Sequence, residues 1–325
     1  MVERLAKLRE HNQLQISPPI LALILAVLLF FFGGILNPDF VNLDQAINIV
    51  RLAAFLGIVA AGQTIVIISG GEGIDLSIGA VVTLGAILTF RITDGEDSRV
   101  LIGLAALLAA GTSIGLINGL GIVLLRIPPL VMTLGMTGVI QGTILVITQG
   151  EMVGDTPEIM SDLIARPLIG KLPGVTILWI IVGVGMWVLL ERTRLGKNLF
   201  AIGTNRTTAR LSGVRVPYVV IAAFTLSGLL SAFGGFVLLA FAQTVFLQLG
   251  DSYLFPSIAA VVVGGTVLAG GRGSYWGTMA GALVLTVIDS LLRAQQLEEA
   301  YQLMVLGLVL VALTSVYGRE QKLRQ

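Results

Sequence analysis

Long apolar runs, separated by short polar segments, dominate the pattern along this chain of 325 residues. A helix needs about 20 mostly apolar residues to cross the hydrocarbon core of a bilayer. The pattern predicts ten membrane spans, at residues 20–36, 46–69, 77–90, 100–125, 130–148, 175–190, 219–242, 254–269, 277–292 and 301–316. The third is short, so it is either a partial or re-entrant segment or its true ends include part of 70–76. The sequence therefore predicts an all-α, polytopic membrane protein with a single transmembrane domain over residues 1–325.

The Lys and Arg residues are distributed unevenly between the two sides of the predicted membrane. With the N-terminus inside, fourteen of the 20 basic residues fall in cytoplasmic segments. Cytoplasmic loops usually carry the excess of positive charge. We therefore expect both termini in the cytoplasm, a basic inner loop at 191–216 and an outer loop at 149–174.

The composition excludes several classes of protein. Charged residues make up only 12% of the chain, against about 25% in soluble domains, which excludes a soluble enzyme. The chain has no Cys, and its one His, His11, lies in the polar N-terminal segment, so thiolate metal sites and Ser–His catalysis within the membrane are excluded. Gly196 and Lys197 lack the flanking residues of a phosphate-binding loop. We expect no enzymatic activity, metal or cofactor in this chain, and the net charge of +1 gives no indication of a nucleic-acid partner.

Uncharged polar side chains occur within several of the predicted spans. Inside hydrocarbon each needs a hydrogen-bonding partner, either a neighbouring helix or a wetted path. Helix–helix bonding is the commoner role for any one of them, but as a set they favour a neutral, hydroxyl-rich solute over an ion. The predicted substrate-path residues are Gln63, Asn118, Gln141 and Gln243.

Two further features of the spans leave alternatives open. Asp289, the one carboxylate within a predicted span, is either an interfacial partner of Arg293 or part of the path. A glycine face on the fourth span favours close packing within the chain, with contact to a second copy as the alternative. It consists of Gly111, Gly115 and Gly119.

Two polar stretches differ from ordinary membrane sequence. Residues 70–79 contain two carboxylates and four glycines, and Asp75 with Ser77 is expected to cap the third span. Residues 201–213 are basic, with small or apolar residues among the charges, and are predicted to form a short amphipathic helix. Such a helix rests either on the membrane surface or on a protein partner.

Three motifs in these regions resemble those of the permease subunits of bacterial sugar-importing ABC transporters, in the ribose, xylose, arabinose and galactose branch. In the first, at 70–79, the matching residues include Gly71, Asp75 and Ser77, although Glu72 and Gly73 are an insertion. The second motif is the segment that docks into the ATPase in that family, and it is matched here by Ala201, Gly203, Asn205, Ala209 and Gly213. The third is the stretch Gly-Gly-Arg-Gly-Ser at 270–274, which contains Gly271 and Gly273. The resemblance covers about residues 46–310.

The resemblance implies a transport subunit of the bacterial inner membrane that moves a monosaccharide or a similar neutral polyhydroxylated solute. It implies a cytoplasmic ATP-binding subunit, which would hold the ATP, a periplasmic or lipid-anchored solute-binding protein, and a second permease that is identical or paralogous, all within membrane lipid. A nucleoside or a signalling furanosyl compound is an alternative solute. An ion- or proton-coupled secondary carrier and a membrane scaffold without transport activity are the alternatives from other classes.

Overall fold

The computed structural model describes residues 17–296, 300–301, 304–305, 307–308 and 311. Within these residues, two apolar helices are short, α4 (Ile78–Thr93) and α12 (Asp251–Val263). Seven helices of the described part are long and apolar enough to cross a membrane. They are α2 (Pro18–Leu36), α3 (Leu43–Ile68), α5 (Val100–Leu124), α6 (Pro129–Thr148), α8 (Gly174–Trp187, continued by the π-helical turn η4, Val188–Arg192), α11 (Val216–Ala242) and α13 (Tyr275–Ala294).

Each of the first nine predicted spans coincides with one of these helices, and the prediction of a mostly helical, polytopic membrane protein is confirmed. The predicted span 301–316 lies largely outside the described residues. The remaining helical segments are short: η1 (Pro38–Phe40), η2 (Asp97–Arg99), α7 (Glu158–Met160), the π-helical turn η3 (Ser161–Ala165), α9 (Arg194–Thr204) and α10 (Arg206–Leu211).

The strictly all-α prediction is wrong at one place. In the segment 149–174, β1 (Pro167–Ile169) and β2 (Leu172–Pro173) pair as an antiparallel hairpin. Proline is unfavourable inside a helix because it lacks the backbone N–H, and prolines occupy both ends of this hairpin. Gly170 makes the turn with a φ of 59°, a conformation that favours glycine.

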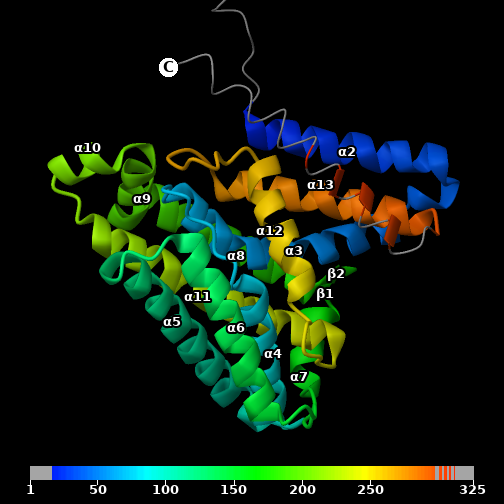
Figure 1. Ribbon diagram of the computed structural model, residues 1–325. Helices are drawn as coiled ribbons and strands as arrows, with labels where there is room; N and C mark the ends of the chain where they lie inside the picture. Colours follow the sequence, from blue (N-terminus) through cyan, green and yellow to red (C-terminus); the bar gives the residue numbers. More distant parts are fainter. Residues whose placement is uncertain (1–16, 297–299, 302–303, 306, 309–310, 312–325) are drawn as a thin grey trace, which may run out of the picture.

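Helix α3 lies at the centre of the bundle. The share of buried residues in its apolar window is 89%, against 17% for α2 and 22% for α6. It packs against α4, α8, α11, α12 and α13, as Figure 1 shows for α12 and α13. The exposed side chains of α2 and α6 are largely Leu, Ile, Val and Phe, which suit contact with lipid or with another apolar helix.

The glycine face of α5 packs against α11 within this chain. A Cβ on Gly111, Gly115 or Gly119 would collide with the backbone of Gly228, Phe224 or Ile221, in that order along the antiparallel pair. Small residues let two membrane helices approach until their backbones touch. The prediction of internal packing is therefore confirmed for this face.

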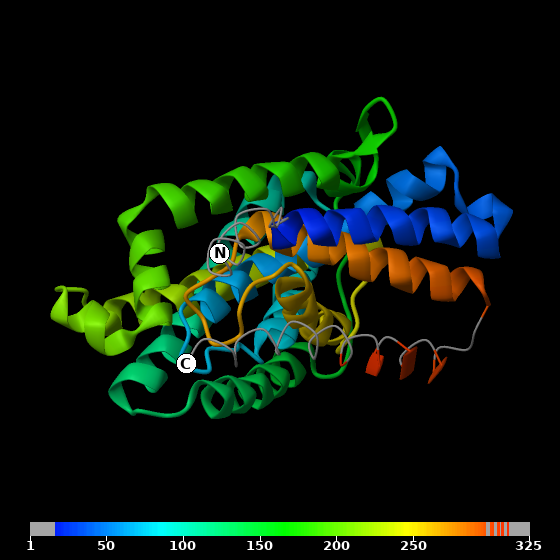
Figure 2. The same ribbon diagram turned by 90° about the horizontal axis from the view of Figure 1, so that it is seen from above.

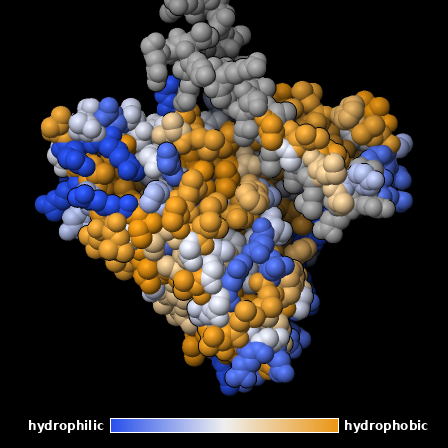
Figure 3. Space-filling view, viewed as in Figure 1, coloured by the Kyte–Doolittle hydropathy of each residue, from blue (hydrophilic) through white to orange (hydrophobic). Residues whose placement is uncertain are grey.

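Polar surface gathers at opposite ends of the molecule. The basic end consists of α9, α10 and the loop 264–274, and the hairpin end consists of η2, the segment 149–166 and the β1–β2 hairpin. Figure 2 shows α9 and α10 at one edge and the green hairpin toward the opposite edge. In Figure 3 the surface over α9 and α10 is strongly hydrophilic, and hydrophobic surface covers most of the adjoining bundle. This division of the surface is expected of a chain that spans a bilayer.

The short helices α4 and α12 each follow a non-helical segment that turns back into the bundle. These segments are residues 69–77, after α3, and residues 243–250, after α11. They bring the first turns of α4 and α12 together: the Gly250 N–H donates to the Thr83 Oγ1 at 2.9 Å, and a Cβ on Gly79 would lie 3.0 Å from the Gly250 carbonyl oxygen. Of the two alternatives left open for the third span, an extension into residues 70–76 is wrong for the helix, because α4 begins at Ile78.

Candidate functional site

Backbone from three separate segments meets at the basic end. The Gly271 N–H donates to the Ile68 carbonyl at 2.9 Å, and a Cβ on Gly70 would lie 2.8 Å from the Cα of Gly203. A Cβ on Gly203 would collide with the backbone of both Ile68 and Gly271, so only glycine fits there. We name this contact the glycine junction: Gly70 and Gly71 after α3, Gly203 in α9, and Gly270 and Gly271 between α12 and α13.

Arg206 holds α10 onto the glycine junction. Its Nη2 donates to the Gly70 carbonyl at 3.1 Å, and its guanidinium lies where a side chain on Gly71 would have to stand. Burial lowers the pKa of the Arg206 guanidinium, yet Arg is so basic that it stays charged at neutral pH. Arg206 is half-buried by these contacts, whereas Arg210, four residues later, is exposed.

The predicted helix over 201–213 is broken into the end of α9 and a separate α10. Asn205 adopts an extended backbone at the break and accepts a hydrogen bond from the Thr208 N–H at 2.9 Å, which caps α10. Asparagine offers the backbone this alternative to a continuous helix. The predicted single helix is therefore corrected to two helices that meet at Asn205.

The predicted coupling residues divide between the interior and the surface. Gly203 and Ala209 are packed within the chain, and Ala201 is half-buried. Gly213 is exposed at the end of α10 with a φ of 87° and open space around it. The neighbouring Leu211 is 84% exposed, which makes it the most exposed of the large apolar side chains of the described part.

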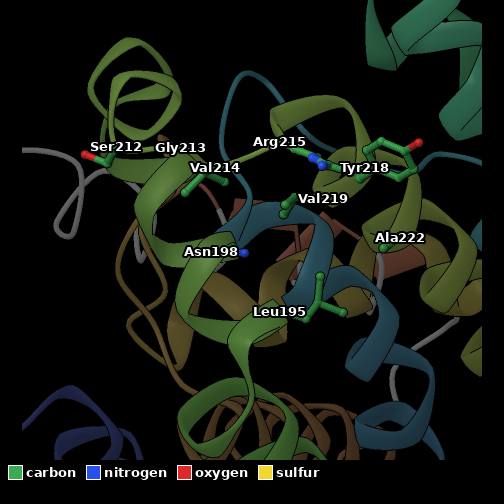
Figure 4. Close-up of a pocket in the computed structure, with 9 residues that line it drawn as sticks. All are labelled: Leu195, Asn198, Ser212, Gly213, Val214, Arg215, Tyr218, Val219 and Ala222. Atoms are coloured by element: carbon green, nitrogen blue, oxygen red, sulfur yellow. The ribbon is translucent and has the colours of Figure 1, made fainter.

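An open pocket of about 610 Å³ separates α9 from the start of α11. Figure 4 shows the turn after α10 along one side of it, with Arg215 and Tyr218 on the other. The Arg215 guanidinium lies 6.0 Å from the centre of the Tyr218 ring, within the range of a cation–π contact. The pocket is lined by Leu195, Asn198, Ser212, Gly213, Val214, Arg215, Tyr218, Val219 and Ala222.

A buried carboxylate organises the segment 69–77. Asp75 accepts hydrogen bonds from the Ser77 N–H at 3.0 Å, the Ser77 hydroxyl at 2.6 Å and the Ser227 hydroxyl of α11 at 2.7 Å. Asn118 of α5 donates to the Ser77 Oγ at 3.0 Å. The expected cap of α4 is absent: the Ser77 side chain makes no cap bond, and Asp75 accepts from the Ser77 N–H, which precedes the first residue of the helix. Three segments of the chain converge on this network: residues 69–77, α5 and α11.

Helix α6 clamps the same segment from the other side. Thr133 accepts from the Leu76 N–H at 3.0 Å, and Thr137 donates to the Leu76 carbonyl at 3.1 Å. Such contacts satisfy the backbone of a non-helical segment inside the bundle. These threonines and Ser227 were not among the predicted site residues, because their partners lie far away in sequence.

The predicted path amides occupy four different environments. Gln63 is fully buried in α3, and neither atom of its amide has a partner among the described residues. Asn118 is buried in the Asp75 network. Gln141 is exposed on α6. Gln243 follows the last residue of α11 at the hairpin end, where its amide donates to the Ser161 hydroxyl at 2.7 Å.

The other singled-out residues are structural in this conformation. Asp289 forms an ion pair of 2.8 Å with Arg293, four residues later on α13, as expected for an interfacial pair. A Cβ on Gly273 would collide with the Thr266 side chain, so the third motif fixes the turn that leads into α13. Among the described residues, no three His, Cys, Asp or Glu side chains gather as metal ligands.

Comparisons with known proteins place the chain in a family. Residues 45–314 match the family model described as "Branched-chain amino acid transport system / permease component". The ribose import permease RbsC of Escherichia coli K12 is 33% identical over 303 residues, which cover 92% of this chain and 94% of that protein. RbsC of Bacillus subtilis is 35% identical, over 90% of this chain and 89% of its own.

Relatives with other named solutes are about as similar. The fructose import permease FrcC of Rhizobium meliloti is 31% identical over 92% of this chain and 85% of its own. The autoinducer 2 import permease LsrC of Yersinia enterocolitica is 31% identical over 94% of this chain and 85% of its own. No solved structure matches. The chain is therefore a multi-pass membrane protein that belongs to the permease components of ABC import systems, and it is a transport subunit rather than an enzyme.

Proposed function

We propose that this chain is the membrane subunit of an ATP-driven importer that carries a monosaccharide, or a similar neutral polyhydroxylated solute, across the bacterial inner membrane. Relatives named for ribose and fructose import support this solute class. The observation that carries the proposal is the glycine junction, which joins α9 and α10 directly to the interrupted segment 69–77. A partner that moves α10 would thereby move a segment inside the bundle.

The basic end is the cytoplasmic end in this proposal, and the chain crosses the membrane ten times. Basic side chains of α9 and α10 support this orientation, because positive charge is retained on the cytoplasmic side. A separate ATP-binding subunit docks at the tip formed by Leu211 and Gly213 and extends over the pocket beside Arg215. The packed residues Ala201, Gly203 and Ala209 position the tip, and Asn205 sets the angle between its helices.

The solute path runs along a face of this chain that a second permease completes. Of the predicted path residues, Gln141 on α6 and Gln243 at the hairpin end already lie exposed. Gln63 and Asn118 are buried in this conformation, so in this proposal they reach the solute only after the bundle rearranges. A periplasmic or lipid-anchored solute-binding protein delivers the solute to the hairpin end.

Docking is tested with Leu211→Arg in the transporter assembled from the permease, its cognate ATP-binding subunit and its solute-binding protein. Gly213 is a poorer test position, because a side chain at its φ of 87° strains the backbone even without a partner. The expected result is loss of co-purification with the ATP-binding subunit and of ATP-dependent uptake of radiolabelled D-ribose or D-fructose into proteoliposomes. The matched control, Leu168→Arg, changes a residue 48% exposed at the hairpin end and should retain co-purification.

Parent-like co-purification and uptake by Leu211→Arg would contradict the docking assignment. Uptake that persists without ATP and collapses with an uncoupler would instead identify a secondary carrier. Competition by a nucleoside or by autoinducer 2 in the same assay distinguishes the alternative solutes, of which the second is supported by the similarity to LsrC.

A further inference from the structure

A polar patch lies on the exposed face of the bundle where α12 begins. Gln248, Asp251 and Ser252 are exposed there, beside the rings of Phe246 and Phe255, which are 52% and 66% exposed. We call these five residues the inner patch. Figure 3 shows hydrophilic surface near the lower end of α12, surrounded by hydrophobic surface.

The inner patch is deep in the bundle, although its sequence position suggests an outer loop. Gly250 contacts Gly79 and Thr83, which lie in the first two turns of α4. Thr83 precedes the last residue of α4 by ten positions, which corresponds to about 15 Å along the helix. The hydrocarbon core is about 30 Å thick, so with the last residue of α4 at its edge, Asp251 lies near its middle.

Two of the three polar side chains of the inner patch have no partner within the described part of the chain. Neither the Asp251 carboxylate nor the Gln248 amide makes a hydrogen bond or ion pair there, and the Ser252 hydroxyl reaches only the Leu249 carbonyl at 3.5 Å. A carboxylate that faces hydrocarbon is costly, and such residues usually line a water-filled cavity or a transport pathway. The patch therefore faces a wetted space in the working transporter.

The side chains of the patch suit one class of solute. Carboxylate and amide oxygens accept hydrogen bonds from hydroxyl groups, and the Gln248 amide also donates. Exposed Phe rings offer apolar surface for the C–H face of a sugar ring. A simple anion would be repelled by Asp251, whereas a neutral polyol satisfies both kinds of surface.

We propose that Gln248, Asp251 and Ser252 contact the transported polyol at the middle of the membrane, with Phe246 and Phe255 against its apolar face. The inference rests on the proposed function, because it places the solute of that transporter. It also locates the solute: between the second permease and the place where the short helices α4 and α12 meet.

The first experiment measures uptake in proteoliposomes that contain the complete transporter, with radiolabelled D-ribose and D-fructose as probes. Asp251→Asn should lower uptake per ATP hydrolysed by about tenfold, because a neutral amide accepts a hydrogen bond from the solute more weakly than a carboxylate does. Gln248→Leu should lower it by roughly fivefold, because it removes a hydrogen bond. ATP hydrolysis stimulated by the loaded binding protein should persist, whereas a folding defect would lower both. The matched control is Asp44→Asn, which removes an acid from the first turn of α3 at the molecular surface.

The two failures are distinguishable. A parent transporter that takes up neither sugar with ATP would contradict the proposed function itself. If the parent transports and both Asp251→Asn and Gln248→Leu keep its uptake per ATP, the solute-contact role of the inner patch is wrong. The proposed function would be unaffected.

A second experiment uses single cysteines, since the native chain has none. In the assembled transporter, cysteine at position 251 should react with a hydrophilic thiol reagent, and D-ribose with the loaded binding protein should slow that reaction. Cysteine at position 146, on the apolar surface of α6, should stay unreactive. A position 251 that is unreactive after assembly would show that lipid or the second permease covers the patch, and would overturn the proposal.

Discussion

The two interrupted regions of the bundle have the same plan and opposite environments. In each, a long helix ends, a non-helical segment turns inward, and a short helix begins beside a carboxylate: Asp75 before α4 and Asp251 in the first turn of α12. Asp75 is buried and accepts three hydrogen bonds. Asp251 is exposed, and its carboxylate makes no hydrogen bond or ion pair with the described part of the chain.

The difference assigns a structural role to Asp75 and a solute-binding role to Asp251. A buried carboxylate with several donors holds its surroundings in one geometry, and its loss leaves those donors unsatisfied. An exposed carboxylate at membrane depth contributes little to holding the fold and is free to bind. The 69–77 break is also tied to the glycine junction, so it is connected to the basic end, and the 243–250 break is not.

The largest effect should come from removing the two carboxylates in turn. Asp75→Ala leaves the Ser77 N–H and two hydroxyls without their acceptor, and should lower the free energy of unfolding by about 3 kcal/mol. Asp251→Ala should change it by less than about 0.5 kcal/mol, as for a surface substitution. Thermal melting of the purified permease in detergent measures both, and equal losses would refute the distinction between the two breaks.

Arg206→Met should have the next largest effect, through the Gly70 carbonyl. The loss of this charge-assisted hydrogen bond should cost about 2 kcal/mol and should weaken coupling between ATP hydrolysis and uptake. Arg210→Met is the control, because Arg210 lies on the same short helix but is exposed. Melting and coupled uptake are measured together; identical behaviour of the two variants would mean that Arg206 does not transmit movement to the 69–77 break.

A smaller and opposite effect is expected at Gln63. Both amide atoms are buried without a described partner, so Gln63→Met should stabilise this conformation by about 1 kcal/mol. If Gln63 meets the solute after rearrangement, the same variant should transport more slowly despite melting at a higher temperature. A lower melting temperature would show that the amide is already bonded, for example by a buried water.

The smallest effect should come from Asp289, which belongs to neither break. Its ion pair with Arg293 is partly exposed, and such pairs contribute little. Asp289→Asn should therefore shift the free energy of unfolding by less than about 0.5 kcal/mol and leave uptake of D-ribose unchanged. A tenfold loss of uptake would show that Asp289 lies on the solute path, and would contradict its assignment as an interfacial partner of Arg293.

Much of the architecture follows from local sequence. The apolar runs located nine helices of the described part. This works because every backbone polar group of a span must be hydrogen-bonded within the protein, since hydrocarbon offers no hydrogen-bonding partner. The spacing of Gly111, Gly115 and Gly119 predicted the packing face of α5 for a similar local reason. Asn205 shows where local pattern is insufficient: its neighbours favour a helix, but its side chain caps the next one.

The sequence by itself determined that this is a polytopic transport subunit and that its basic segment follows the sixth span. It also determined that three short motifs resemble those of one family. Only the tertiary structure decided that all three motifs meet at one glycine junction, and that Asp75 is buried while Asp251 is exposed. The physical reason is that burial and hydrogen bonding depend on residues distant in the chain. Ser227 reaches Asp75 across 152 positions, and Thr83 reaches Gly250 across 167, distances over which no local pattern carries information.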